Sequence, residues 1–350
     1  MLTNSILIMK AAFVGNRSTV VIKDIPIPKI RRGTILVRMR ACGLCGSDLE
    51  KIYGEYGMTS GRLGHEPAGE IVRVGGKVSG FREGDRVFVH HHVSCCSCYF
   101  CLHGSSTMCS SFQQSNIDPC GLSELFLVPQ YNVERGAVIR LPSHVTFEAA
   151  SFIEPLACCI RAISKSRIRS GDNVAVFGAG PTGLMLAALV RHSGASNIAL
   201  IDFNQFRLDY AKKFGDFDVL SAGDPSLTSS IHQLTEKRGV DIAIIATGSG
   251  AAMQNALKVT RKGGTIILFG VPSKRAQMTL DFSSIYANEL CIIPSYAASE
   301  IETNLSLRLI AEGRINLSKL VTHRYAIDQV ADAIREAHEA TNTMKVLITN

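Results

Sequence analysis

NVAVFGAGPTG, residues 173–183, is the stretch that decides the fold of this chain. Asn173–Phe177 has the apolar, β-branched composition of a buried strand, and it runs directly into glycines at positions 178, 180 and 183. The apolar segment that follows, Leu184–His192, predicts a helix. A glycine-rich turn between a strand and a helix lets the backbone approach a pyrophosphate, which lies at the helix N-terminus. The stretch therefore predicts a dinucleotide-binding unit.

The next predicted strand, Asn197–Ile201, leads into Asp202, and this position bears on the choice of cofactor. A carboxylate there can accept hydrogen bonds from the adenosine ribose diol. It would repel a 2′-phosphate, and Phe203 supplies no cation, so the pattern favours NAD over NADP. Arg207 leaves NADP as the alternative cofactor, because a nearby arginine can accommodate that phosphate. The cofactor-binding candidates are Gly178, Gly180, Pro181, Thr182, Gly183, Asp202, Arg207 and, after the following strands, Thr247, Gly270 and Val271.

Strands and helices continue to alternate after this unit. Asp241–Ala246 and Thr265–Phe269 are predicted strands, and Met253–Val259 between them is a predicted helix. Such alternation is typical of a doubly wound parallel sheet with helices on its faces. The predicted fold class of this region is therefore α/β.

Residues 10–90 have a different pattern, with short β-branched segments separated by glycine and proline. Their close spacing is typical of an all-β, barrel-like domain. The tail from about residue 295 is expected to return to this domain, with an amphipathic helix at Asp328–Ala340 and a last strand at Lys345–Ile348. We predict one domain from residues 1–156 with 295–350 and a second from residues 157–294. The predicted early strands are Ala11–Val14, Thr19–Ile22, Thr34–Ala41, Gly69–Val74 and Arg86–Val89.

Four cysteines between residues 95 and 109 have the spacing of a structural metal site. Cys95, Cys98, Cys101 and Cys109 form the pattern C-x2-C-x2-C-x7-C. Four thiolates can close a tetrahedral shell around zinc. An iron–sulfur cluster also uses four thiolates, but the long last gap and the absence of Cys-Pro favour zinc. Cys96 could replace Cys95 only by shortening the first gap.

Cys45, Ser47 and His65 predict a second, open zinc site. A thiolate, an imidazole and a carboxylate suit Zn²⁺, and catalytic zinc sites keep one position for water or substrate. Ser47 lies two residues after Cys45, so its hydroxyl could face that position. Glu66, directly after His65, could supply the carboxylate.

Other histidines and cysteines give weaker signals. His90, His91 and His92 are consecutive, and side chains along a strand alternate between its two faces. One or two of them at most could therefore face a site. The cysteines that lack a partner spacing are expected to be small buried residues; they are Cys42, Cys120, Cys158, Cys159 and Cys291.

Length and composition set bounds on the function. A chain of 350 residues suggests about two domains, and 46% hydrophobic with 19% charged residues is ordinary for a globular enzyme. No apolar run has the length of a membrane span, and the segment before Met9 is too short for a signal peptide. Eleven clustered cysteines fit metal-bound thiolates in the cytoplasm better than disulfides. The net charge of +7 is not gathered into a run that would indicate nucleic-acid binding.

In combination these motifs make the chain resemble the zinc-dependent medium-chain alcohol dehydrogenases, in particular their sorbitol (polyol) and threonine dehydrogenase branches. The resemblance covers nearly the whole chain from Met9. It implies a GroES-like β-barrel catalytic domain that carries two zincs, with a Rossmann domain inserted before the last part of the chain. It also implies oxidation of a secondary alcohol or polyol with NAD, and a homotetramer.

The resemblance assigns roles to individual residues. Ser47 matches the hydroxyl that contacts the substrate alcohol, and Asp48 matches the acid that orients the zinc-bound histidine. The four-cysteine motif matches the family's structural zinc lobe. The ligands of the catalytic zinc fall on Cys45, His65, Glu66 and Glu154.

The chain departs from its relatives at two places. Glu50 stands where many relatives have the histidine that ends a proton relay, so the relay must end at Glu50 or in water. His92 matches a histidine near the substrate in threonine dehydrogenases, whereas Ala157 and Cys158 stand where those enzymes show Gly-Asn. The branch signals conflict, so L-threonine 3-dehydrogenase is the near alternative to a polyol dehydrogenase.

Two further hypotheses concern class and assembly. A non-catalytic dinucleotide-binding protein is the alternative of another class, and the intact zinc-ligand sets argue against it. For the tetramer, Thr265–Phe269 and Met278–Ile285 are the stretches expected to present sheet edges to a second copy.

Overall fold

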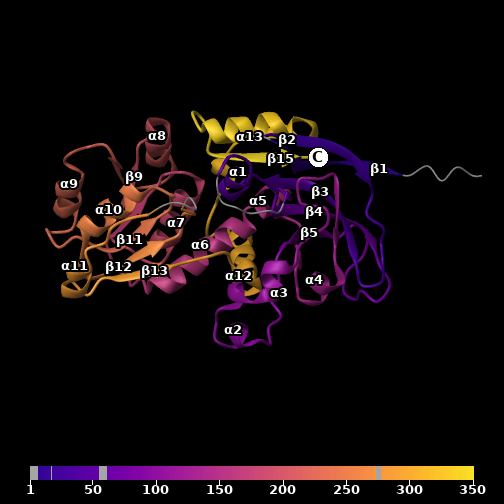
Figure 1. The fold of residues 1–350 in the computed structure, drawn as a ribbon, viewed down its shortest axis with the longest axis horizontal. Coiled ribbons are helices and arrows are strands. Elements are labelled where there is room, and N and C mark those ends of the chain that lie inside the picture. The colour runs from indigo at the N-terminus through magenta and orange to yellow at the C-terminus, as the bar shows by residue number, and fades with distance from the viewer. Residues whose placement is uncertain (1–6, 17, 55–60, 273–276) are drawn as a thin grey trace, which may run out of the picture. The chain divides into compact units, whose positions relative to one another are not determined.

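The computed structural model describes residues 7–16, 18–54, 61–272 and 277–350 (Figure 1). It forms two compact units, one from Met1–Ala157 with Ala298–Asn350 and the other from Cys158–Ala297. The first unit is thus built from two separate stretches of chain. Most of the segment before Met9, where no signal peptide was expected, lies outside the described residues. Within the described part of the chain, no helix is long and apolar enough to cross a membrane.

The second unit contains a six-stranded sheet in which all neighbouring strands run parallel, in the order β10-β9-β8-β11-β12-β13. β8 and β9 are buried at almost every position, as expected for strands covered by helices on both faces. The predicted doubly wound α/β fold is therefore confirmed. The strands are β8 Val174–Phe177, β9 Ile198–Asp202, β10 Asp218–Ser221, β11 Val240–Ile245, β12 Thr260–Leu268 and β13 Cys291–Pro294.

Helices connect these strands as the sequence pattern predicts. The predicted helix after the glycine-rich turn is α7, which packs on β8 and β9. Proline at its first position fits a helix start, because the missing N–H has no partner there in any case. The helices of this region are α6 Ile153–Ser166, α7 Pro181–His192, α8 Gln205–Phe214, α9 Leu227–Leu234, α10 Gly250–Val259 and α11 Phe282–Ala287.

The prediction that two stretches of the second unit form sheet edges was wrong. Thr265–Phe269 belongs largely to β12, which lies between β11 and β13 inside the sheet. Met278–Ile285 contains no strand, and its last four residues are in α11. A run of apolar residues marks a strand covered on both faces, which places it away from an edge. The edge on this side is β13, which is partly exposed.

The first unit contains a seven-stranded sheet with β3 at its centre and a separate two-stranded sheet. β3 pairs antiparallel with β4, β6 and β15. The sequence did not predict β14, which lies beside β15 and runs parallel to it. The strands are β1 Ile8–Val14, β2 Val20–Pro26, β3 Ile35–Gly43, β4 Glu66–Val74, β5 Arg86–Val89, β6 Leu125–Val128, β7 Val138–Arg140, β14 Val321–Ala326 and β15 Lys345–Thr349.

The return of the C-terminal tail follows from packing. Val346 and Ile348 on β15 are buried in the same core as Val37 and Met39 on β3. The helix predicted at Asp328–Ala340 is shorter than expected and is preceded by one 3₁₀ turn. The helices of this unit are α1 Gly46–Tyr53, α2 Tyr99–Leu102, α3 Ser110–Gln114, α4 Gln130–Glu134, α5 Phe147–Ala150, α12 Glu300–Ala311 and α13 Val330–Glu339, with 3₁₀ turns at Ser106–Met108, Ser318–Leu320 and Ile327–Gln329.

The isolated cysteines differ in burial. Cys42, Cys120 and Cys159 are buried, as expected for small apolar residues. Cys158 is half-buried, and the expectation was wrong for Cys291, which is exposed. Cys291 lies on β13, and an edge strand leaves part of its surface open to solvent.

Candidate metal and dinucleotide sites

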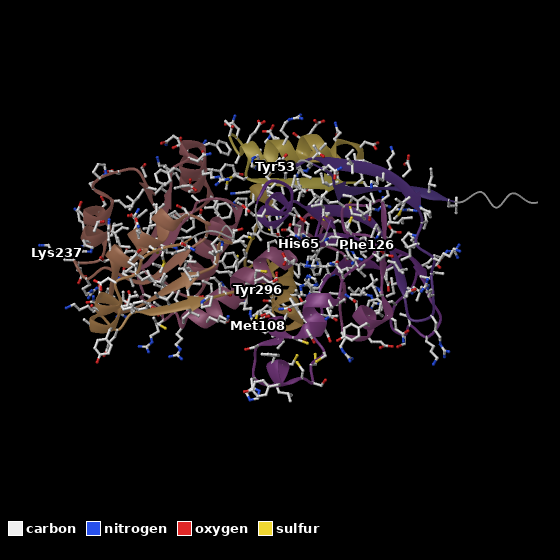
Figure 2. All side chains as sticks on the ribbon, viewed as in Figure 1. Tyr53, His65, Met108, Phe126, Lys237 and Tyr296 are labelled. Atoms are coloured by element: carbon white, nitrogen blue, oxygen red, sulfur yellow. The ribbon has the colours of Figure 1, made fainter. Side chains whose placement is uncertain are left out.

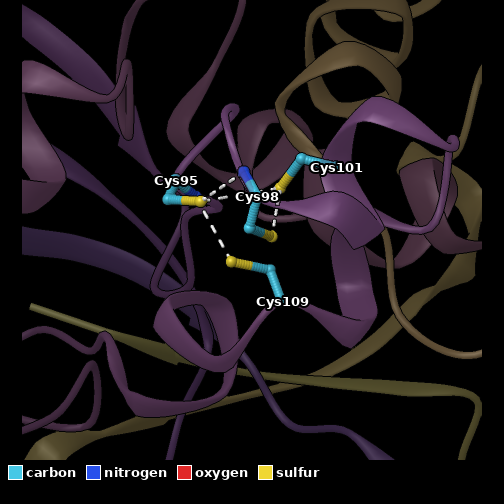
Figure 3. Close-up of side chains that lie close together, drawn as sticks. All are labelled: Cys95, Cys98, Cys101 and Cys109. Carbon is cyan, nitrogen blue, oxygen red and sulfur yellow. Dashed lines mark hydrogen bonds between the residues drawn. The ribbon is translucent and has the colours of Figure 1, made fainter.

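The four cysteines of the predicted structural site come together in one loop region, as Figure 3 shows. Their sulfur atoms all lie within 4.8 Å of one another. The Sγ of Cys101 is 3.5 Å from that of Cys98 and 3.9 Å from that of Cys95. Thiolates bound to one zinc at about 2.3 Å would be roughly 3.8 Å apart, so the arrangement fits the ion. We name residues 95–109 the cysteine lobe.

Backbone groups in the cysteine lobe favour the thiolate form that zinc requires. The N–H of Cys98 donates to the Sγ of Cys95 over 3.3 Å, and the N–H of Cys95 donates to the Sγ of Cys109 over 3.5 Å. Hydrogen bonds, the first of them from the N–H of Ser97, lower the pKa of Cys95 to about 6. Cys96 is exposed and lies outside the group, so the structure selects Cys95 at the ambiguous position.

Cys45, His65 and Glu66 form the second group, and their donor atoms also lie within 4.8 Å of one another. Cys45 immediately precedes α1, and Glu66 is the first residue of β4, so each ligand lies at the end of a regular element. The Oγ of Ser47 is 3.4 Å from the Nε2 of His65. An Oε2 of Glu154, in the first turn of α6, is 3.9 Å from the same nitrogen. Figure 2 labels His65 within the first unit.

Asp48 fixes the orientation of His65. Its side chain is fully buried, and its Oδ1 accepts a hydrogen bond from the N–H of Gly64 and lies 3.4 Å from the Nδ1 of His65. Burial alone would raise the pKa of Asp48, but His65, Lys51 and the Gly64 N–H hold that pKa well below its usual range. A carboxylate on Nδ1 leaves Nε2 for a metal, which is the common arrangement around zinc-binding histidines.

The sequence reasoning missed Lys345, which forms a buried ion pair with Glu66. Its Nζ is 2.8 Å from Oε1 and 2.5 Å from Oε2, and the two side chains are 4% and 0% exposed. Burial lowers the pKa of Lys345, but Glu66, Cys45 and Glu154 together outweigh burial and raise that pKa above its usual value. Within the described ranges, Oε2 accepts no hydrogen bond of good geometry, so it retains a lone pair that suits a cation. The available signal was a lysine that opens an otherwise apolar strand.

The three consecutive histidines lie beside this group. The ring of His91, and not that of the predicted His92, is the one in contact with His65, with ring centroids 5.3 Å apart. His92 lies against His91, and its Nδ1 is 2.5 Å from the carbonyl oxygen of Ser115. Burial lowers the pKa of His92 to about 4 and that of His91 well below its usual range. The site therefore has two neutral imidazoles in addition to His65.

Glu50 is not part of the metal group. It is half-buried on α1, three residues after Ser47. Residues three apart on a helix share a face, so Glu50 lies on the same side of α1 as Ser47. The structure thus brings Ser47 to His65 and leaves Glu50 one turn farther along the helix.

The glycine-rich turn has the close approaches that a pyrophosphate site needs. A Cβ on Gly183 would lie 1.8 Å from the carbonyl oxygen of Gly178, so only glycine fits there. Asp202 ends β9 and accepts hydrogen bonds from the N–H groups of Ala179 and Asn204, at 2.7 and 2.9 Å. The guanidinium of Arg207 is 3.8 Å from this carboxylate.

The remaining cofactor candidates follow the carboxyl ends of other strands of the same sheet. Thr247 follows β11 and Gly270 follows β12, and a Cβ on Gly270 would lie 2.4 Å from the Thr247 backbone. Val271 directly follows Gly270 in the sequence. Its carbonyl oxygen lies so close to Gly248 that a Cβ there would be 2.5 Å from it. Carboxyl ends of parallel strands are where dinucleotides bind in sheets of this kind. The predicted cofactor-binding candidates thus all lie at the carboxyl ends of strands in the second unit.

Two zinc ions per chain are expected in the purified protein, because one group is closed by four thiolates and the other is open. Elemental analysis of protein prepared with zinc would count them. Cys109→Ser should remove the ion of the cysteine lobe, and Cys45→Ser should remove the other, so each variant should retain one. A single zinc ion in the unaltered protein would contradict one of the two assignments. The variant that does not lower the zinc content would then show which group binds no zinc.

Comparisons with known proteins agree with both units. The alcohol dehydrogenase GroES-like domain family matches residues 31–143, and the zinc-binding dehydrogenase family matches residues 181–312. Sorbitol dehydrogenase of Bacillus subtilis is 32% identical over 97% of each chain. L-threonine 3-dehydrogenase of Pectobacterium atrosepticum is 30% identical over 87% of this chain and 84% of its own.

A solved structure resembles the fold over nearly the whole chain. It is a putative zinc-binding dehydrogenase from Sinorhizobium meliloti bound to NADP, with a TM-score of 0.84 and 25% identity. The match covers 98% of this chain and 100% of the other. The combination of a GroES-like unit and a Rossmann-type parallel sheet is therefore confirmed.

Proposed function

Since this chain belongs to the zinc-dependent medium-chain alcohol dehydrogenase family, we propose that it oxidises a secondary alcohol or polyol to a ketone with transfer of a hydride to NAD. The observation that supports this most directly is the group of Cys45, His65 and Glu66 with the Ser47 hydroxyl 3.4 Å from the Nε2 of His65. A hydroxyl beside an open metal site is suited to receive the proton that an alcohol must lose on oxidation.

The residues of this chain have distinct tasks in such a reaction. Bound zinc would polarise the substrate oxygen, and bound NAD would accept the hydride. Ser47 takes the hydroxyl proton and passes it to Glu50 or to water. Asp48 keeps the His65 ring in place through Nδ1, and Lys345 positions Glu66. Either Glu66 or Glu154 supplies the acidic ligand.

L-threonine 3-dehydrogenase is the second candidate, supported by the threonine dehydrogenase relative and by His92 beside the site. A screen of NAD reduction with polyols, sugars, L-threonine and simple secondary alcohols distinguishes the two. We expect the highest kcat/KM with a polyol or secondary alcohol. Failure of the zinc-loaded protein to oxidise any of them with NAD or NADP would favour a non-catalytic dinucleotide-binding protein.

NAD is the proposed cofactor, and Asp202 is the proposed cause of the preference. Asp202→Ala should weaken NAD binding and narrow the gap to NADP, because the carboxylate that would bind the ribose diol and repel a 2′-phosphate is removed. Titration of NADH and NADPH with the protein, followed by the change in the fluorescence of the nicotinamide, measures the two dissociation constants. A stronger affinity of the unaltered protein for NADPH would contradict the assignment and would direct attention to Arg207.

We also propose a homotetramer, with the β13 edge as one contact between copies. Among the described residues, β13 is one of the two edge strands of the six-stranded sheet, the other being β10. The helix α11 just before β13 exposes Phe282 and Tyr286, at 76% and 87%. Exposed aromatic side chains beside an unpaired strand are typical of a surface that associates. Light scattering should give four times the chain mass of 37.8 kDa. A mass of one chain would contradict the proposal, and Phe282→Asp with Tyr286→Asp should reduce the assembly.

A further inference from the structure

A cavity of about 430 Å³ lies in the first unit and shares no lining residue with either metal group. Three cationic side chains line this cavity, those of Lys29, Arg31 and Arg32, and all three residues are exposed. Within the described ranges of the chain, none of the three makes an ion pair. Like charges around one cavity repel one another, and a bound anion would offset that repulsion. The cavity is therefore a candidate anion site.

The backbone that carries the two arginines is held in a tight turn. The N–H of Arg31 donates to the Oγ1 of Thr34 over 2.8 Å, and this hydroxyl donates to the carbonyl oxygen of Arg31, also over 2.8 Å. Gly33 has a φ of +79°, which favours glycine, and its N–H donates to the carbonyl oxygen of Gly76 over 2.7 Å. Thr34 itself lines the cavity and is buried. The turn is thus ordered before a ligand arrives, which lowers the entropic cost of binding.

The rest of the lining adds a carboxylate, an amide and an apolar part made of two prolines and a leucine. Asp118 supplies the carboxylate, and two backbone hydrogen bonds with Leu127, at 2.9 and 2.7 Å, fix its position. Gln130 supplies the amide and donates one of its hydrogens to Glu134 over 2.6 Å, so its oxygen can accept from a ligand. The cavity can therefore bind hydroxyl groups as well as an anion.

We propose that this cavity binds a phosphate monoester whose carbon part carries hydroxyl groups, as in a sugar phosphate. Three cations and one carboxylate give the lining side chains a net charge of 3 − 1 = +2. A phosphate monoester carries about −1.5 to −2 at neutral pH, so the two charges balance. Arginine side chains bind phosphate through paired, charge-assisted hydrogen bonds. The volume also lies within the range of about 300–1,000 Å³ that is usual for small-molecule sites.

The carboxylate of Asp118 distinguishes this ligand from other phosphates. It would repel a nucleic-acid strand or a polyphosphate, which carries further negative charges along its length. Inorganic phosphate would leave this carboxylate without a partner, whereas the hydroxyl groups of a sugar donate hydrogen bonds to it. Binding at this cavity requires no turnover, so it is independent of the proposed alcohol oxidation.

The test uses glucose 6-phosphate as the probe, with glucose and inorganic phosphate as comparators, titrated into the zinc-loaded full chain by calorimetry. Excess NADH keeps phosphate away from the glycine-rich turn of the second unit. We expect one glucose 6-phosphate per chain and an affinity that falls as salt is added. Arg31→Gln with Arg32→Gln should weaken binding at least about tenfold, the effect of losing one charge-assisted hydrogen bond. Asp118→Ala should narrow the difference in affinity between glucose 6-phosphate and inorganic phosphate.

The matched control is Lys258→Gln with Lys262→Gln, which removes the same number of charges from exposed residues of the second unit and should leave the affinity unchanged. Equal weakening by the two double variants would overturn the site, as would no saturable binding of glucose 6-phosphate. Equal affinities for glucose 6-phosphate and either comparator would overturn the class of ligand. A single-stranded oligonucleotide that binds more tightly, and loses affinity only in the arginine variant, would assign the cavity to nucleic acid instead.

Discussion

Replacing Ser47 with alanine is expected to lower turnover by about 10²–10⁴-fold, the usual contribution of general acid–base catalysis. Its Oγ lies 3.4 Å from the Nε2 of His65, next to the position at which we propose that a substrate hydroxyl loses its proton. Ser47 is not among the metal ligands, so the zinc content of the variant should stay that of the unaltered protein. Steady-state kinetics with the best substrate of the screen, together with elemental analysis, measure both effects.

Two further variants interpret the result for Ser47. Ser318→Ala is the control, because Ser318 is an exposed serine in a 3₁₀ turn and belongs to neither candidate metal group. Glu50→Gln tests whether Glu50 receives the proton from Ser47. If Glu50 receives it, turnover falls and the acidic limb of the pH–rate profile changes, whereas an unchanged profile means that the proton leaves through water. Unchanged turnover for Ser47→Ala would contradict the placement of the substrate hydroxyl.

Replacing Lys345 with methionine is expected to lower the free energy of unfolding by about 3–5 kcal/mol, the effect of leaving one charge of a buried ion pair without its partner. Glu66 is fully buried, and Lys345 contacts both of its carboxylate oxygens. Urea denaturation of the zinc-loaded full chain measures the loss. Lys345→Arg should preserve most of the stability, because it keeps the charge.

The chain offers a matched control for Lys345. Lys10 pairs with Asp328 at 2.6 Å, a similar distance, but these side chains are 40% and 59% exposed. Water screens such a pair, so Lys10→Met should change stability much less. The double variant Lys345→Met with Glu66→Gln should recover part of the loss, since no unpaired charge remains. Equal effects of Lys345→Met and Lys10→Met would contradict the importance of the buried pair.

Several features of the chain could be predicted because their residues are neighbours in the sequence. The glycine-rich turn depends on a strand, a turn and a helix that follow one another, and the cysteine lobe needs only fifteen consecutive residues, 95–109. Cys45 and Ser47 are held by one short helix, α1. Spacing alone constrains such groups, since a short chain can reach few other arrangements.

Other features required the folded chain because their partners are distant in the sequence. Lys345 and Glu66 are 279 positions apart, and they meet because β15 pairs with β3, which pairs with β4. The residue pattern of a strand shows how buried it is but not which strands lie beside it. The sequence therefore wrongly predicts an edge at β12, whereas the edge strand on that side is β13.

The amino-acid sequence by itself predicted the two candidate metal groups, the glycine-rich turn and the α/β class, because each is a local pattern of residue type and spacing. Only the tertiary structure decided that Lys345 holds Glu66 and that His91 contacts His65. The reason is physical: a buried charge or imidazole is defined by what surrounds it in space, and those surroundings come from strands and loops far apart in the chain.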